Sequence, residues 1–156
     1  MSAEQDMGML RVDTDTHSLD VDMIHRVLAS AYWSENIPRA VVERAIAGSL
    51  CFGGYLDGHG QVAFARMITD GATFAYLADV FVLPDYRGRG YAKALVAEVM
   101  AHPDVQGLRR IMLATRDAHR LYARFGFVPV AAPDRLMEIH VPGIYRQPAG
   151  VSEVSA

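Results

Sequence analysis

The chain has 156 residues, of which 51% are apolar and 21% charged, enough for one domain with a sizeable core and too few for two. This balance excludes a disordered, collagen-like or low-complexity chain. The net charge of −3 provides no positive field that would concentrate nucleic acid or an anionic membrane, so neither is expected as a partner.

The first half of the chain predicts a short strand, two helices and a hairpin. Ser18 or Asp20 can cap the first helix, and Gly48 ends the second. The turn at 57–60 reads Asp-Gly-His-Gly, which is typical of a tight connection between two strands. In chain order, we expect a strand at 10–12, helices over 24–31 and 41–46, and strands at 50–56 and 61–69.

The second half predicts a central strand followed by alternating helices and strands. Residues 73–83 are aromatic, β-branched and almost continuously apolar, as in a strand buried on both faces, and Pro84 ends the run. Asp117 can cap a short helix that stops at Gly126. After the central strand, we expect a helix over 92–100, a strand at 110–114, a helix over 118–125, and strands at 127–130 and 136–141. This order predicts an α/β (α+β) domain over residues 8–142, with flexible tails at 1–7 and 147–156.

The turn at 87–93, RGRGYAK, joins the central strand to the next helix and carries the clearest functional signal. Its two glycines and Ala92 let backbone amides approach an anion, and the following helix directs its first N–H groups to the same place. Two arginines and Lys93 add cations suited to a diphosphate that bears a further phosphate. The chain lacks the Gly-Lys-Ser/Thr of a Walker loop, and Lys93 stands where a Rossmann fingerprint needs a small residue.

Two motifs resemble those of the GNAT superfamily of N-acetyltransferases. Residues 87–92 match its acetyl-CoA-binding pattern, Q/R-x-x-G-x-G/A, and residues 121–127, LYARFGF, resemble its LY-x-x-x-GF signature. The resemblance covers residues 8–142 and implies a mixed, mostly antiparallel sheet of about six to seven strands flanked by about four helices. It also implies acetyl-CoA as co-substrate, no metal, and transfer of acetyl directly to a primary amine of a small molecule or a peptide.

The resemblance assigns roles to individual positions. The backbone of 80–82 would bind the pantetheine arm along a splayed sheet edge, and the turn at 87–93 would hold the diphosphate. Tyr122 matches the tyrosine that protonates, or donates a hydrogen bond to, the departing thiolate. Thr115 stands where the family often has asparagine, which leaves one pantetheine contact open. The positions implied for the cofactor are Val80, Phe81, Val82, Arg87, Gly88, Arg89, Gly90, Tyr91, Ala92 and Lys93.

Asp79 is the candidate general base, because an ammonium substrate must lose a proton before its nitrogen can attack. It is the only carboxylate inside the apolar run at 73–83, and an apolar setting makes a carboxylate more ready to accept a proton. The main-chain N–H of Val82 is expected to meet the oxyanion. A water-relayed base elsewhere, or a purely structural Asp79, stays open as an alternative.

Several other residues have competing interpretations. Tyr32, Trp33, Tyr55 and Arg66 are candidates for an acceptor pocket, with ordinary packing as the alternative. Cys51 is expected to be a small core residue rather than a nucleophile. The histidines show no metal-ligand spacing, so no metal is predicted.

The remaining expectations concern location, partners and alternative functions. The single cysteine, the lack of a signal-peptide pattern at 1–10 and the lack of a long apolar run favour a cytoplasmic protein. Fourteen arginines against one lysine suggest a bacterial source, and the resemblance leaves a homodimer open. Two other functions stay in view: a non-catalytic acyl-CoA-binding sensor or regulatory module, and a domain that binds ATP or NAD.

Overall fold

The computed structural model describes residues 6–146 and contains one mixed sheet with the strand order β1-β2-β3-β4-β5. Neighbouring strands are antiparallel except β4 and β5, which run parallel. The strands are β1 (Arg11–Asp13), β2 (Leu50–Leu56), β3 (Gly60–Thr69), β4 (Phe74–Val82) and β5 (Arg110–Leu113). The predicted α/β class is confirmed. Residues 1–5 and 147–156, which include most of the predicted tails, lie outside the described residues.

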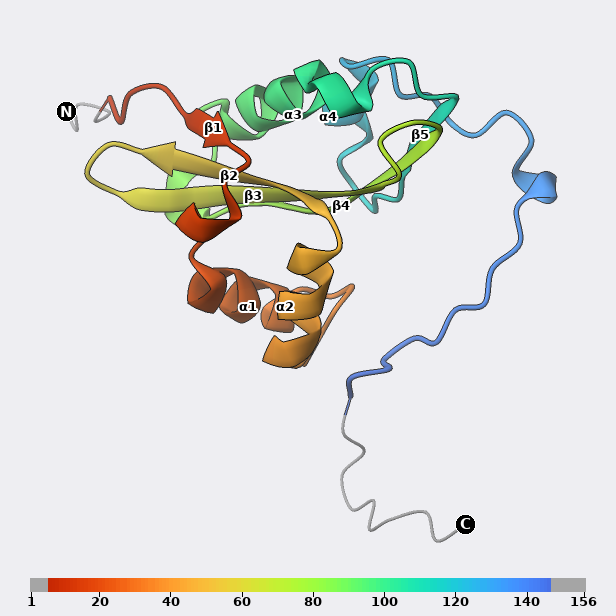
Figure 1. Ribbon diagram of the computed structural model, residues 1–156, viewed down its shortest axis with the longest axis horizontal. Helices are drawn as coiled ribbons and strands as arrows, with labels where there is room; N and C mark the ends of the chain where they lie inside the picture. The colour runs from red at the N-terminus through yellow and green to blue at the C-terminus, as the bar shows by residue number, and fades with distance from the viewer. Residues whose placement is uncertain (1–5, 147–156) are drawn as a thin grey trace, which may run out of the picture.

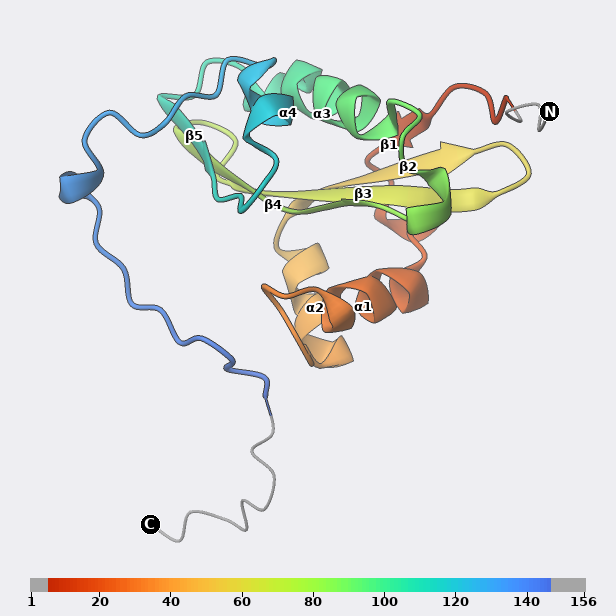
Figure 2. The same ribbon diagram turned by 180° about the vertical axis from the view of Figure 1, so that it is seen from behind.

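Helices cover both faces of the sheet (Figures 1 and 2). On one face lie α1 (Val21–Ser30) and α2 (Arg39–Ala47), and on the other α3 (Tyr91–Ala101) and α4 (His119–Ala123). Asp20 caps α1 by accepting a hydrogen bond from the Met23 N–H, as expected of an aspartate before an apolar stripe. Because both faces are covered, β2 and β3 are buried along most of their length, which explains their almost continuous apolar sequence.

Strand β4 contains a bulge at Asp79. In β3, Ala65 alone faces two residues of β4, Asp79 and Val80, because the pairing shifts by one residue. Leu77 packs on the α3 side of the sheet, whereas Phe81 packs on the α1 and α2 side. In a regular strand these two side chains would share a face, so the bulge reverses the alternation.

Strands β4 and β5 separate part of the way along β4. They pair from Phe74 opposite Arg110 as far as Leu77 opposite Leu113. Within the described chain, the later residues of β4 pair only with β3. The edge of β4 over residues 78–82 is therefore open on the β5 side, which is the splayed edge that the sequence resemblance implies.

The strands predicted at 127–130 and 136–141 are wrong, so the sheet has five strands rather than six or seven. Both segments belong to an extended stretch of chain that leaves the body after Phe127 (Figure 1). Pro129, inside the first segment, lacks the N–H group that a strand must donate to a neighbour. The apolar pattern is present in both segments, but pairing also needs an adjacent strand, and among residues 6–146 no strand pairs with this stretch.

The predicted cap of the fourth helix is also wrong. Ala118, not Asp117, is the N-cap of α4, and its N–H donates to the hydroxyl of Thr115 at 2.9 Å. The predicted stop is confirmed, because Gly126 has φ 90°, the left-handed conformation that ends helices.

Candidate functional site

A cavity of about 620 Å³ opens where β4 and β5 separate. Its walls include Tyr32 and Trp33 from the loop after α1, the β4 bulge, and Ala118 and Tyr122 at the start of and within α4. Since α1 and α4 cover opposite faces of the sheet, the cavity reaches both faces at the splayed edge. A volume of this size suits a small molecule or a single extended side chain.

Asp79 lies in the wall of this cavity with both carboxylate oxygens hydrogen-bonded. The Trp33 indole N–H donates to Oδ1 at 2.8 Å, and Nε of Arg66 donates to Oδ2 at 2.9 Å. Arg66 is itself held by the hydroxyl of Ser49 at 3.0 Å. The Asp79 side chain is only 10% exposed and that of Arg66 16%. A nearly buried carboxylate is thus fixed in orientation, with lone pairs left for a further donor.

The backbone of Asp79 explains how a β4 carboxylate comes to face this wall. Its φ is 55°, in the left-handed region that is uncommon for residues other than glycine and best tolerated by aspartate and asparagine. This conformation accompanies the bulge, and bulges often reorient a side chain beside a functional site.

Tyr122 reaches the same cavity from α4. The residue is 8% exposed and packs against Phe127, with ring centroids 5.9 Å apart in a T-shaped arrangement. Burial raises the pKa of its hydroxyl, so the phenol keeps its proton over the physiological range. The two interpretations of this residue are compatible, because a packed ring can still present a hydroxyl to a cavity.

The cavity brings together some of the predicted site residues and not others. Asp79, Val80 and Tyr122 line it, whereas Phe81, Val82 and the turn at 87–93 do not. The latter lie farther along β4 and at the start of α3, so an elongated ligand could follow the open strand edge from the cavity to the turn.

The turn at 87–93 has an open, uncapped surface. Gly88 and Gly90 have φ of 76° and 85°, and a Cβ atom placed on either would meet no heavy atom within 4 Å. Gly90 is the N-cap of α3, and no side chain caps the first N–H groups of this helix. These groups are therefore available to an anion.

The longer side chains at this turn differ in exposure and in their hydrogen-bond partners. Arg87 and Lys93 are exposed, and Nε of Arg87 donates to the carbonyl oxygen of Val82 at 2.9 Å, which ties the turn to β4. Tyr91 is buried and donates its hydroxyl proton to the carbonyl oxygen of Gly8 at 2.8 Å. Only the backbone of Tyr91 can face a ligand at the turn.

Three of the four candidate acceptor-pocket residues, Tyr32, Trp33 and Arg66, line the cavity. Tyr55 does not. It lies beneath the guanidinium of Arg11, which is 4.7 Å from the ring centroid, and burial raises the pKa of its hydroxyl to about 12. For Tyr55 the structure favours the alternative of ordinary packing, because β2 places this side chain away from the splayed edge.

Arg116 and Tyr145 are among the cavity residues that sequence reasoning did not single out. The guanidinium of Arg116 lies 4.1 Å from the ring centroid of Tyr32, and Tyr145 comes from near the end of the described chain. No local motif marks either residue. Their proximity to the site arises from contacts between segments that are far apart in the sequence.

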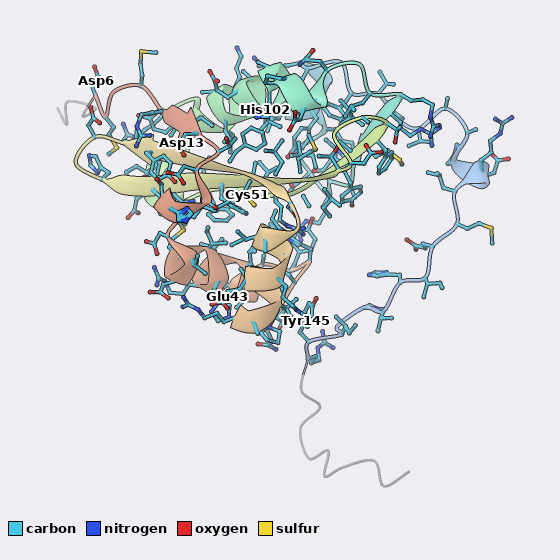
Figure 3. All side chains as sticks on the ribbon, viewed as in Figure 1. Asp6, Asp13, Glu43, Cys51, His102 and Tyr145 are labelled. Atoms are coloured by element: carbon cyan, nitrogen blue, oxygen red, sulfur yellow. The ribbon has the colours of Figure 1, made fainter. Side chains whose placement is uncertain are left out.

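Cys51 lies in the core, as Figure 3 shows, and is 2% exposed. Burial raises the pKa of its thiol to about 11, so the nucleophilic thiolate is disfavoured. Among residues 6–146, no three histidine, cysteine, aspartate or glutamate side chains are grouped as metal ligands. No helix in this described part is long and apolar enough to cross a membrane.

Comparison with known proteins identifies the family. Residues 20–127 match the model of the acetyltransferase (GNAT) family. A Gibberella zeae protein described as a candidate acetyltransferase is 35% identical over 139 residues, which cover 75% of this chain and 77% of that protein. The chain therefore belongs to the GNAT acetyltransferase family, in which acetyl-CoA is the co-substrate.

Solved structures agree with this assignment. A GNAT-family protein of Xanthomonas campestris pv. campestris, also described as a candidate acetyltransferase, is 60% identical with a TM-score of 0.87, covering 90% of this chain and 99% of that one. A Staphylococcus aureus protein with 22% identity shares the fold, with a TM-score of 0.68 over 85% of this chain and 100% of that one.

Proposed function

We propose that the protein is an acetyl-CoA-dependent N-acetyltransferase, with residues 8–142 as its catalytic domain, that moves acetyl directly to a primary amine of a small molecule or a peptide. One observation carries the proposal: a single cavity at the splayed edge of β4 contains both an oriented carboxylate, Asp79, and a protonated phenol, Tyr122.

The open edge of β4 and the turn at 87–93 together suit an elongated, phosphorylated co-substrate. Backbone groups of 80–82 can pair with the amides of a pantetheine arm as an added strand would. The uncapped amides of α3, with Arg87 and Lys93 beside them, can hold the diphosphate. The open space above Gly88 and Gly90 allows the phosphates to approach the backbone closely.

The chemistry requires one bond to form and one to break. The nitrogen of the acceptor bonds to the acetyl carbon, and the bond from that carbon to sulfur breaks. Asp79 accepts the proton that the ammonium group loses, directly or through an ordered water. Tyr122 donates a hydrogen bond or its proton to the departing sulfur, and the main-chain N–H of Val82 stabilises the oxyanion.

The lining of the cavity suits an acceptor that combines an amine with an apolar portion. The Asp79 carboxylate, which is paired with Arg66, keeps lone pairs that can accept a hydrogen bond from the amine, and Tyr32 and Trp33 supply aromatic surface beside it. Trp33 also holds Asp79 in place, so binding of the acceptor and orientation of the base depend on the same side chain.

The test is release of free thiol from acetyl-CoA in the presence of a panel of primary amines, with binding of CoA measured separately. Turnover on at least one amine, lost in Tyr122→Phe while CoA still binds, supports the enzyme. Tight CoA binding with no turnover on any amine supports the alternative of a non-catalytic acyl-CoA-binding module.

A further inference from the structure

Arg116 lies at the outer end of the cavity at the splayed edge. Its side chain is 65% exposed, and Tyr32, against which it packs, is 55% exposed. Asp79 and Tyr122, the two groups proposed to act on the reacting atoms, line the same cavity and are nearly buried. An acceptor that enters from solvent and brings its amine to Asp79 therefore passes Arg116.

Aromatic contacts hold the guanidinium of Arg116 in place. Its Cζ atom lies 4.1 Å from the ring centroid of Tyr32, a contact that arginine makes readily with aromatic faces. Tyr32 in turn meets Trp33 in a T-shaped arrangement with ring centroids 5.1 Å apart, and Trp33 is hydrogen-bonded to Asp79. One continuous chain of contacts thus connects the outer cation to the candidate base. A guanidinium that is already ordered binds a ligand at a smaller entropic cost than a freely moving one.

The hydrogen-bond donors of Arg116 are unused within the described chain. A guanidinium has five N–H donors in a planar fork that matches a carboxylate. Nη2 of Arg116 lies 3.6 Å from Oδ2 of Asp117, too far for a hydrogen bond, and both side chains of this ion pair are exposed. Arg66, which also lines the cavity, differs because it donates to Asp79 and Ser49. Arg116 is therefore the arginine of this cavity whose fork is available to a ligand.

The cavity wall also includes apolar side chains. Ile37, Tyr76 and Leu113 line it in addition to the aromatic residues of the loop after α1. An amine at Asp79 and an anion at Arg116 leave this surface for an apolar part of the same molecule. One cavity thus offers a partner to each of three different chemical groups.

We propose that Arg116 binds a carboxylate of the acceptor, and hence that the acceptor is an amino acid with an apolar portion rather than a simple amine. This inference rests on the proposed N-acetyltransferase function and adds the class of its acceptor. The amine faces Asp79, the carboxylate accepts hydrogen bonds from the guanidinium of Arg116, and the apolar portion packs against the wall. Paired hydrogen bonds between a guanidinium and a carboxylate are among the stronger ones in proteins.

The test compares amino acids with the amines that lack their carboxylate. Phenylalanine with phenethylamine is one pair and γ-aminobutyrate with propylamine is the other, so that the pairs differ in the distance from amine to carboxylate. The measured quantity is the preference, which is kcat/KM for the acid divided by kcat/KM for its amine, from thiol release at one pH and ionic strength. We expect a preference of about tenfold or more in at least one pair for the wild type.

Arg116→Met keeps the length of the side chain and removes its charge. We expect the preference to fall to about one in this variant, because the carboxylate loses its partner. A purely structural effect lowers kcat/KM for both members of a pair and leaves the preference unchanged. The matched control is Arg120→Met, an exposed arginine of α4 outside the cavity wall, which should keep the wild-type preference. A wild-type preference near one in both pairs, or a preference that survives in Arg116→Met, overturns the inference.

Binding of phenylalanine and of γ-aminobutyrate to the CoA-saturated protein, measured by isothermal titration calorimetry, separates this inference from the proposed function. Binding that weakens about tenfold or more in Arg116→Met supports the carboxylate site even if no amine is acetylated, a result that contradicts the transferase alone. Acetylation of the amines with no preference for either acid overturns the carboxylate site and leaves the transferase intact. If neither acid binds and neither is acetylated, the inference is overturned.

Discussion

Asp79 combines a rare backbone conformation with a nearly buried charge. A left-handed φ costs most residues about 1–2 kcal/mol, and a buried carboxylate is costly unless it is paired. Here Arg66 and Trp33 satisfy the carboxylate, and the bulge in β4 accommodates the backbone. Strain of this kind is typical of a site where the side chain must face a ligand.

Asp79→Asn tests the proton-accepting role. Asparagine tolerates the same φ and can still accept from Trp33, but it cannot take up a proton at neutral pH. We expect kcat to fall about 100-fold or more. The control is Ser49→Ala, which removes the other partner of Arg66 and leaves the carboxylate in place. Wild-type kcat in Asp79→Asn contradicts the role, and a matching loss in Ser49→Ala shows that the effect is structural.

Tyr122→Phe tests the proton-donating role. It removes only the hydroxyl and preserves the packing against Phe127. We expect kcat to fall about 100-fold or more while the Kd for CoA changes less than about threefold. The matched control is Tyr55→Phe, an equally buried tyrosine outside the cavity, for which kcat should stay unchanged. Unchanged kcat in Tyr122→Phe contradicts the assignment.

At the scale of elements, the turn between β4 and α3 depends on glycine at two positions. Gly90→Ala adds a methyl group into open space, so its cost arises from the left-handed φ, about 1–2 kcal/mol. The methyl group also blocks the approach of a phosphate, and we expect the Kd for CoA to rise about tenfold or more. Isothermal titration calorimetry measures the affinity.

Gly58→Ala is the matched control for this turn. Gly58 lies in the β2–β3 hairpin with φ 78°, and a Cβ atom placed there would also meet no heavy atom within 4 Å, so the conformational cost is similar. Its CoA affinity should equal that of the wild type. Equal loss of affinity in both variants contradicts a phosphate site at the turn and indicates general destabilisation.

The elements that the sequence predicted are those determined by local information. The four helices and β1 to β5 follow from periodicity, capping and turn residues within each segment. The strands predicted at 127–130 and 136–141 failed because strand formation depends on an adjacent edge, which local pattern cannot supply. Asp117 failed as a cap because Thr115 competes for the same turn.

The residues of the candidate site also divide into those that local sequence marks and those that only tertiary structure brings together. Tyr122 and the turn at 87–93 stand in recognisable motifs, and Asp79 stands out as a carboxylate in an apolar run. The ion pair of Asp79 with Arg66 was not predictable, because it depends on the bulge that shifts the register of β4. Arg116 and Tyr145 reach the cavity only through tertiary contacts.

For the whole molecule, the buried thiol of Cys51 and the buried phenol of Tyr55 predict a loss of stability at alkaline pH. Burial raises the pKa of Cys51 from 9.0 to about 11 and that of Tyr55 from 10.0 to about 12. The folded state therefore binds these protons more tightly than the unfolded chain. Their stabilising contributions are complete below pH 9 and are lost as pH rises through these folded values.

Urea unfolding at several pH values between 8 and 11 measures this effect. We expect the free energy of unfolding of the wild type to fall by about 2 kcal/mol or more over this range. In Cys51→Ala the fall should be smaller by about 1–3 kcal/mol, because the thiol no longer contributes. An identical pH dependence in the two proteins contradicts the account of Cys51.

The measurement that tests the central claim most directly is thermal unfolding of the wild-type protein with acetyl-CoA, CoA, ATP or NADH. At about a hundredfold excess over the Kd, a ligand of the folded state adds about 2.7 kcal/mol, which raises the midpoint by several degrees. We predict this increase for acetyl-CoA and CoA alone. An increase with ATP or NADH and none with either CoA species would contradict the assignment of the open β4 edge and the turn at 87–93.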